Sequence, residues 1–297
     1  MKFLTIFLAV SAWGQMDSSV LQFGSGPYWA GWSEPIRGGQ KNSVCDWRQV
    51  PRVEAVRDIL VMVRVEGGKV GKMRLSSTEC KIETEGLPFH LLEGISAQAS
   101  VNWLKARAIA EGEDNALAAL ALHDAAVSDP ALEELTSVYQ PEKVRSRASF
   151  WLGNVSGQRG YSALERMLAN DPSEKVRKEV TFALSLSKVP GALAKLIDVA
   201  KNDRTPAVRG QALFWLAQKA GNKQAAEVVA DGVNDPDRQV KESAVFALSR
   251  LPKEESVPRL IELAKTNRDP DVRKKAMFWL GQSKDPKAVD FIEQVLK

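Results

Sequence analysis

The chain has 297 residues, of which 44% are hydrophobic and 26% charged, which is ordinary for a soluble globular protein and enough for two modest domains. Lys and Arg together number 41 against 37 Asp and Glu, so the formal net charge of +4 is small. Because these cations form no basic run, the composition argues against a nucleic-acid-binding protein.

The first residues have the pattern of a secretory signal peptide. Met1 and Lys2 give a charged start, residues 3–10 are largely apolar, and small residues follow at Ala12 and Gly14. A membrane anchor is the alternative, but about eight apolar residues are too few to cross roughly 30 Å of hydrocarbon. We therefore predict that residues 1–14 are a signal peptide, and that the mature protein is extracytoplasmic (periplasmic or secreted) without membrane insertion.

Residues 15–97 are rich in Gly, Pro and β-branched residues, and they predict a small β-rich module. Residues 58–65 and 69–75 are expected to be strands, because the first of them alternates valine with other residues. Gly67 and Gly68 between them suit a tight hairpin turn. A third strand is predicted over residues 78–83.

The two cysteines of the chain, Cys45 and Cys80, both lie in this module. Export favours a disulfide between them. A metal pair is less favoured, because no second Cys or His lies at ligand spacing beside either one. A cluster of aromatic residues, Trp29, Trp32 and Trp47, offers a further hypothesis, binding of a cell-wall glycan.

From residue 98 to residue 297 the sequence repeats with a period of 32 residues. One column of the repeat holds Phe150, Phe182, Phe214, Phe246 and Phe278, and another holds Val144, Val176, Val208, Val240 and Val272. Residues four apart, such as Val144, Ala148 and Leu152, lie on one helix face. The spacing predicts helix pairs over 98–124, 129–154, 161–187, 191–219, 223–250 and 255–283, and a lone last helix over 286–297.

These repeats resemble short bacterial HEAT repeats, the type often named after phycobilisome lyases. The motif Asp-x-x-x-x-Val-Arg-x-x-Ala carries the resemblance, as in residues 171–180 and 203–212. Val180 replaces the Ala in one unit, and the Asp is shifted or missing in the units of Arg145 and Arg273. The resemblance implies a mainly α, right-handed α–α superhelix of the armadillo type, whose relatives mostly act as scaffolds. With its signal and β module, the chain looks like an exported member.

A cation follows each valine of the column: Arg145, Arg177, Arg209, Lys241 and Arg273. Asp171 and Asp203 lie six residues before Arg177 and Arg209. In HEAT-like stacks such an Arg tends to bond this Asp and the carbonyls of adjacent turns. We therefore predict a structural ladder that ties one repeat to the next, in preference to a basic stripe that faces a ligand.

The residue after each phenylalanine alternates between tryptophan and alanine, so the unit of duplication is a pair of repeats. The tryptophans are Trp151, Trp215 and Trp279. Either each indole packs across the alanine of a neighbouring repeat, or the three form an aromatic ladder on the concave face. In the middle repeat Gly210, Gln211 and Lys219 flank this row, and we assign Gln211, Lys219 and the tryptophans as candidate binding residues.

No catalytic motif is found in the sequence. The two histidines are His90, expected in the core, and His123, expected to be solvated or to cap a helix end. The leading hypothesis is a non-enzymatic scaffold that binds a protein or peptide on the concave face, without cofactor or metal. The alternative is an enzyme accessory or lyase-like protein whose chemistry lies in the β module, at Cys45, Cys80 and His90.

Overall fold

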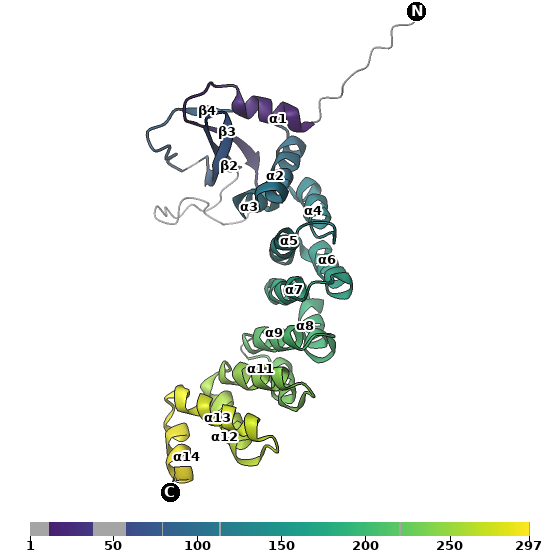
Figure 1. The fold of residues 1–297 in the computed structure, drawn as a ribbon, viewed down its shortest axis with the longest axis vertical. Helices are drawn as coiled ribbons and strands as arrows, with labels where there is room; N and C mark the ends of the chain where they lie inside the picture. Colours follow the sequence, from purple (N-terminus) through teal and green to yellow (C-terminus); the bar gives the residue numbers. More distant parts are fainter. Residues whose placement is uncertain (1–11, 38–57, 79, 113, 220, 297) are drawn as a thin grey trace, which may run out of the picture. The chain divides into compact units, whose positions relative to one another are not determined.

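The computed structural model describes residues 12–37, 58–78, 80–112, 114–219 and 221–296. The chain is mainly helical and divides into two compact units, Met1–Ser156 and Gly157–Lys297. Figure 1 shows the elements of both units. Residues 1–11 of the predicted signal peptide and Cys45 lie outside the described residues. Signal cleavage and the disulfide between Cys45 and Cys80 therefore stay predictions.

The first unit contains a four-stranded sheet with the strand order β3-β2-β1-β4. The strands are β1 (Tyr28–Pro35), β2 (Asp58–Glu66), β3 (Lys69–Ser77) and β4 (Phe89–Leu91). β1 pairs antiparallel with β2 and parallel with β4. The predicted hairpin is confirmed: β2 and β3 are antiparallel, and both glycines of the turn have positive φ angles, 58° at Gly67 and 70° at Gly68.

The third predicted strand, over residues 78–83, is wrong. The described residues of this segment form no strand, and the Cys80 N–H donates to the Ser77 carbonyl at 3.0 Å in a turn. Ile82 is the one large apolar side chain of the segment, and it is 37% exposed, so there is too little to bury against the sheet. The chain turns again at Glu85 and Gly86, whose φ angles are 58° and 77°, before β4 adds to the sheet.

The helices of the first unit share the core of the sheet. They are α1 (Ala12–Leu21), α2 (Ala97–Glu111), α3 (Asp114–Leu122), α4 (Ala125–Glu134) and α5 (Glu142–Val155). Ile59 of β2 packs with Leu122 of α3, and Trp32 of β1 meets Trp103 of α2 edge-to-face at 5.4 Å. The Trp103 indole donates to Asp17 of α1 at 2.7 Å. The apolar core therefore continues across the predicted boundary near residue 97.

The second unit consists of helix pairs joined by short turns. The pairs are α6 (Gly157–Asn170) with α7 (Glu174–Leu186), α8 (Gly191–Asn202) with α9 (Pro206–Ala217), α10 (Lys223–Asp231) with α11 (Arg238–Ser249), and α12 (Lys253–Thr266) with α13 (Pro270–Ser283). A 3-10 turn, Gly232–Asn234, precedes α11, and α14 (Pro286–Leu296) is the last helix. The second helices contact one another in series, α7 with α9, α9 with α11 and α11 with α13.

The valine column forms the core between the helices, as predicted. Its members are between 0% and 3% exposed: Val144, Val176, Val208, Val240 and Val272. The leucines two turns later, such as Leu184, Leu216 and Leu248, are at most 1% exposed. The period of the sequence thus places one apolar layer in each repeat, and the predicted helical repeat fold with a small N-terminal sheet is confirmed.

Candidate functional site

A polar turn precedes each second helix of the second unit. Its first residue is an Asp or Asn whose side-chain oxygen accepts the backbone N–H two residues later at 2.8–2.9 Å: Asp171, Asp203, Asp235 and Asn267. This is an Asx turn, and it leads the chain into the helix. The N-cap of α9 is Thr205, so Asp203 shapes the turn before the helix and is not the cap itself.

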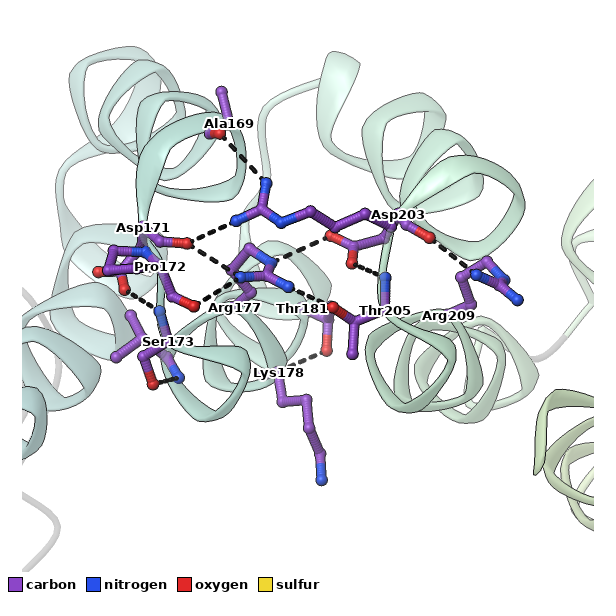
Figure 2. A network of polar contacts seen from close by, with 12 residues as sticks. Ala169, Asp171, Pro172, Ser173, Arg177, Lys178, Thr181, Asp203, Thr205 and Arg209 are labelled. Carbon is purple, nitrogen blue, oxygen red and sulfur yellow. Dashed lines mark hydrogen bonds and ion pairs between the residues drawn. The ribbon is translucent and has the colours of Figure 1, made fainter. Parts of the chain in front are cut away.

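Arg177 and Arg209 each join their own turn to the turn of the next repeat, and Figure 2 shows both contacts for Arg177. Arg177 donates through Nη1 to the Asp171 carbonyl at 2.9 Å and through Nε to the Asp203 carboxylate at 3.4 Å. Arg209 donates through Nη1 to the Asp203 carbonyl at 2.9 Å. Its Nε and Nη2 atoms hold the two Asp235 carboxylate oxygens at 2.9 and 2.8 Å. These are the contacts that the spacing predicts for a structural ladder.

The other cations of the column also contact turns. Arg145, in the first unit, donates at 2.6 Å to a carbonyl of the turn before α5. Lys241 reaches the Asp269 carboxylate at 2.8 Å, and Arg273 donates to the Asn267 carbonyl at 2.8 Å. Asn267 occupies the position of the aspartates and carries no charge, which explains why Lys241 pairs with Asp269 instead. The column therefore fastens turns rather than lining a ligand site.

The side chains of the Arg209–Asp235 pair are largely buried. They are 12% and 11% exposed. Burial alone would raise the pKa of Asp235, but hydrogen bonds from Arg209 and from the Asp237 N–H outweigh burial and hold this pKa below its usual value. The same hydrogen bond raises the pKa of Arg209 above its usual value. Both groups are therefore charged at neutral pH, and the pair is an ion pair.

A row of aromatic rings runs along the second helices of the second unit. Trp215 lies against Phe182 with 4.6 Å between ring centroids, and Trp279 lies against Phe246 at 5.1 Å. Phe214 and Phe246 stack at 5.8 Å with their planes 7° apart. All three tryptophans of the sequence pattern are half-buried, and the indole N–H groups of Trp215 and Trp279 are buried without an acceptor. Each of these indoles is therefore partly packed and partly exposed to solvent. A binding role for the tryptophans stays a prediction.

A groove of about 400 Å³ lies over α9 and α11. Its small residues are Ala207, Gly210 and Ser243, its aromatic residues are Phe214 and Phe246, and its other polar residues are Lys178, Gln211 and Gln239. The two helices approach closely beneath the groove, because a Cβ atom at Gly210 would lie 2.6 Å from the Ser243 Oγ. Glycine is therefore required at position 210, and the close approach leaves a hollow between the side chains that flank it.

The candidate binding residues of the middle repeat divide between the groove and the framework. Gln211 is half-buried and lines the groove. The Lys219 ammonium donates to the Ser185 carbonyl at the C-terminal end of α7, where a cation offsets the helix dipole. Lys219 therefore fastens two repeats, and a role for it in binding has no support from its contacts. Lys178, Gln239 and Ser243 were missed by sequence reasoning, although they share repeat columns with Gly210, Ala207 and Gln211.

The sequence-based expectations for the histidines need correction. His123 is fully buried rather than solvated, and its ring contacts the Ala119 carbonyl at 2.7 Å and the Ser100 hydroxyl at 2.8 Å. Burial lowers the pKa of His123 first of all, and the nearby Arg37 lowers it further, although the Ala119 hydrogen bond acts in the opposite direction. His90 is half-buried and stacks on Phe23 at 4.1 Å, so it belongs to a surface aromatic cluster and not to the core.

The proposed glycan platform in the first unit is also wrong for the residues that the structure describes. Trp29 and Trp32 are 0% exposed, and their indole N–H groups donate to the Thr84 carbonyl at 3.1 Å and the Ser100 hydroxyl at 2.7 Å. Both rings therefore belong to the core around the sheet, where a glycan cannot stack on them. Trp47 lies outside the described residues.

One acidic residue of the first unit is buried without a partner. Glu34 of β1 is 4% exposed, and its Oε1 has no hydrogen-bond donor. Burial raises the pKa of Glu34 to about 7.

Within the described parts of the chain, no group of three or more His, Cys, Asp or Glu side chains has the arrangement of a metal site. Nor is any helix in these same parts both long and apolar enough to span a bilayer.

The chain is similar to several solved structures. The complex of CpcE and CpcF of phycocyanin lyase from Nostoc sp. PCC7120 is 22% identical with a TM-score of 0.39, and the match covers 52% of this chain and 98% of that chain. Human deoxyhypusine hydroxylase in complex with glycerol is 18% identical with a TM-score of 0.29, over 68% of this chain and 74% of that chain. A designed armadillo repeat protein in complex with the peptide (KR)4 is 20% identical with a TM-score of 0.36, over 65% and 96%.

Comparisons of the sequence itself point to one kind of repeat. A search of curated proteins found no match. The family model described as HEAT repeats matches residues 128–217 and 193–277. The model described as PBS lyase HEAT-like repeat matches residues 272–297. The two matches to the first model together span residues 128–277, which are 150 of the 297 residues.

Proposed function

Because this chain belongs to the HEAT-repeat family, we propose that it is a non-enzymatic scaffold that holds a protein or peptide on the second helices of its repeats. The observation that carries this proposal is the groove over α9 and α11, which combines two stacked phenylalanine rings with two side-chain amides. Aromatic rings supply contact area at protein interfaces, and amides can hydrogen-bond a peptide backbone. Lys178 is the single charged residue of the described lining, so the groove suits a polypeptide better than a nucleic acid.

The ladder of turns supports the same proposal. Arg177 and Arg209 tie the turn before each second helix to the turn before the next one. The walls of the groove are therefore fixed before a partner arrives, and less conformational entropy is lost when it binds. A pre-organised surface of this kind is what a scaffold needs.

The proposal includes export. It rests on the signal-like pattern of residues 1–14. Residues beyond that pattern belong to the fold, since Met16 and Val20 of α1 are 3% and 0% exposed. N-terminal sequencing of the protein recovered from outside the cytoplasm should give a start at Trp13 or Gln15. Recovery of the protein in the cytoplasm with Met1 intact would contradict export.

Site-specific photo-crosslinking tests the binding proposal. A photoreactive residue is placed at Gln211, in the groove, or at Gln224, an exposed glutamine of α10 that does not line it. The expected result is a discrete crosslinked polypeptide from position 211 that is absent or much weaker from position 224. Equal crosslinking from both positions would contradict binding in the groove, and no crosslinked polypeptide from either would contradict the scaffold function.

A further inference from the structure

The polar side chains of the groove differ from those around it, because they have no partners within the protein. Lys178, Gln211, Gln239 and Ser243 line the groove, and their side chains make no hydrogen bond or ion pair with any other described residue. In Figure 2 the Lys178 side chain extends away from the network around Arg177. Side chains left unpaired together in one hollow are available to a ligand.

The charged residues beside the groove are, in contrast, mostly paired with one another. Glu242 of α11 accepts from Arg238 at 3.0 Å and from Lys275 at 3.4 Å, and Arg238 also meets Asp271 at 3.4 Å. Glu179 follows Lys178 on α7, but it is exposed and is not part of the lining. The field inside the groove is therefore set mainly by the Lys178 ammonium, and it favours a negative group.

The apolar part of the groove lies at a different point. Phe214 and Phe246 come one helical turn after Gly210 and Ser243 along α9 and α11, and their rings stack in parallel. Lys178 lies on the neighbouring helix α7. Packed helices are about 10 Å apart, which is the length of about three residues of an extended chain. Gln211 of α9 and Gln239 of α11 also line the groove.

We propose that the groove binds an extended segment of a partner polypeptide that carries an acidic side chain near an apolar or aromatic one. The acidic group pairs with Lys178, the apolar group packs on Phe214 and Phe246, and the amides of Gln211 and Gln239 pair with backbone groups of the bound segment. This inference rests on the proposed scaffold function and adds the chemistry of the partner to it.

An array of short synthetic peptides tests the inference with the full-length protein as the probe. Each peptide has a Gly/Ser background and one Phe, combined with one Asp, Asn or Lys at varied spacing. The expected result is that Asp-Phe peptides bind more tightly than Asn-Phe peptides by on the order of fivefold, the effect of one exposed ion pair. In Lys178→Met this preference should disappear, and in Lys178→Glu it should reverse in favour of Lys-Phe peptides.

A matched variant controls for the change in net charge. Lys223→Glu makes the same charge change at an exposed lysine of α10 that does not line the groove, and it should leave the preference for Asp-Phe peptides unchanged. Circular dichroism melts should show that the Lys178 variants keep the fold.

The outcomes separate the inference from the proposed function. Retention of Phe peptides without a charge preference, or an Asp preference that persists in Lys178→Glu, would overturn the inference and leave the scaffold function standing. If no peptide is retained and the photoreactive residue at position 211 also crosslinks to no polypeptide, both the inference and the scaffold function are contradicted.

Discussion

Replacement of Arg209 by methionine is the most direct test of the ladder. Arg209 makes three hydrogen bonds: one to the Asp203 carbonyl at 2.9 Å and two to the Asp235 carboxylate at 2.9 and 2.8 Å. Methionine keeps most of the aliphatic stem but can make none of them. The variant therefore leaves a carboxylate that is 11% exposed without its counter-ion.

The expected loss follows from this burial. Removal of one partner of a buried ion pair costs about 3–5 kcal/mol, because the other charge remains unpaired. Asp235 keeps the hydrogen bond from the Asp237 N–H at 2.8 Å, and the pair is not fully buried. We therefore expect Arg209→Met to lower the free energy of unfolding by about 3 kcal/mol, at the lower end of that range.

Arg238→Met is the matched control. Arg238 also meets two carboxylates, those of Glu242 at 3.0 Å and Asp271 at 3.4 Å, but its side chain is 72% exposed. Exposed ion pairs contribute about 0–1 kcal/mol, so this variant should lose at most that amount. Urea unfolding followed by circular dichroism measures both variants. Equal losses for Arg209→Met and Arg238→Met would refute the argument from burial.

The pH dependence of the free energy of unfolding gives a second test of the Arg209–Asp235 ion pair. The pKa of Asp235 in the folded protein is held below its usual value. Stability from this group is present above the unfolded pKa of about 4 and is lost as the pH falls through the folded pKa. The difference between wild type and Arg209→Met should therefore shrink below about pH 4.

Three further predictions concern other parts of the protein. Gly210→Ala should destabilise by about 1–3 kcal/mol, since its Cβ would lie 2.6 Å from a serine hydroxyl of α11. Gly281→Ala, with nothing within 4 Å, should stabilise by about 0.5–1 kcal/mol, and thermal melts that shift both variants in the same direction would contradict this packing. Burial raises the pKa of Glu34 from 4.5 to about 7, so the wild type should lose stability as the pH rises across that window. Glu34→Gln should therefore stabilise at about pH 8 by on the order of 2 kcal/mol and much less at about pH 5, and a gain independent of pH in urea unfolding would count against it. Alkylation and mass spectrometry of the exported protein should find Cys45 and Cys80 without free thiols, and two alkylated cysteines would disprove the disulfide.

The helical repeats could be predicted because the sequence itself repeats with a fixed period. A residue type that recurs every 32 positions, such as the valine column from Val144 to Val272, marks the same place in each repeat. The cation ladder followed for the same reason, since its cations recur with that period, as do Asp171, Asp203 and Asp235. β1 was not predicted, because Gly31 and Pro35 are unusual in strands. Gly31 is required there by space: a Cβ would lie 2.9 Å from the Val61 carbonyl oxygen and 3.0 Å from the Phe89 ring.

The candidate site was harder to predict, because it is defined by what its side chains do not contact. Gln211 and Lys219 both look like variable surface residues in the sequence, yet one lines the groove and the other holds a carbonyl of the preceding repeat. Lys178 and Arg177 are adjacent cations, but Arg177 is 1% exposed within the ladder while Lys178 faces the groove. Spacing does not separate such pairs, since the outcome depends on neighbours from other repeats.

The ion pairs between successive repeats have a consequence for how this chain can change in length. In each pair the cation comes from one repeat and the carboxylate from the following one, as with Arg209 and Asp235. A duplication or deletion of 32 residues within this unit brings an equivalent cation to an equivalent carboxylate, so the junction closes again. A change of 64 residues also keeps the alternation of Trp215 and Ala247 in step. Recombination by whole repeat pairs can therefore lengthen or shorten the array and still place each cation opposite a carboxylate of the following repeat.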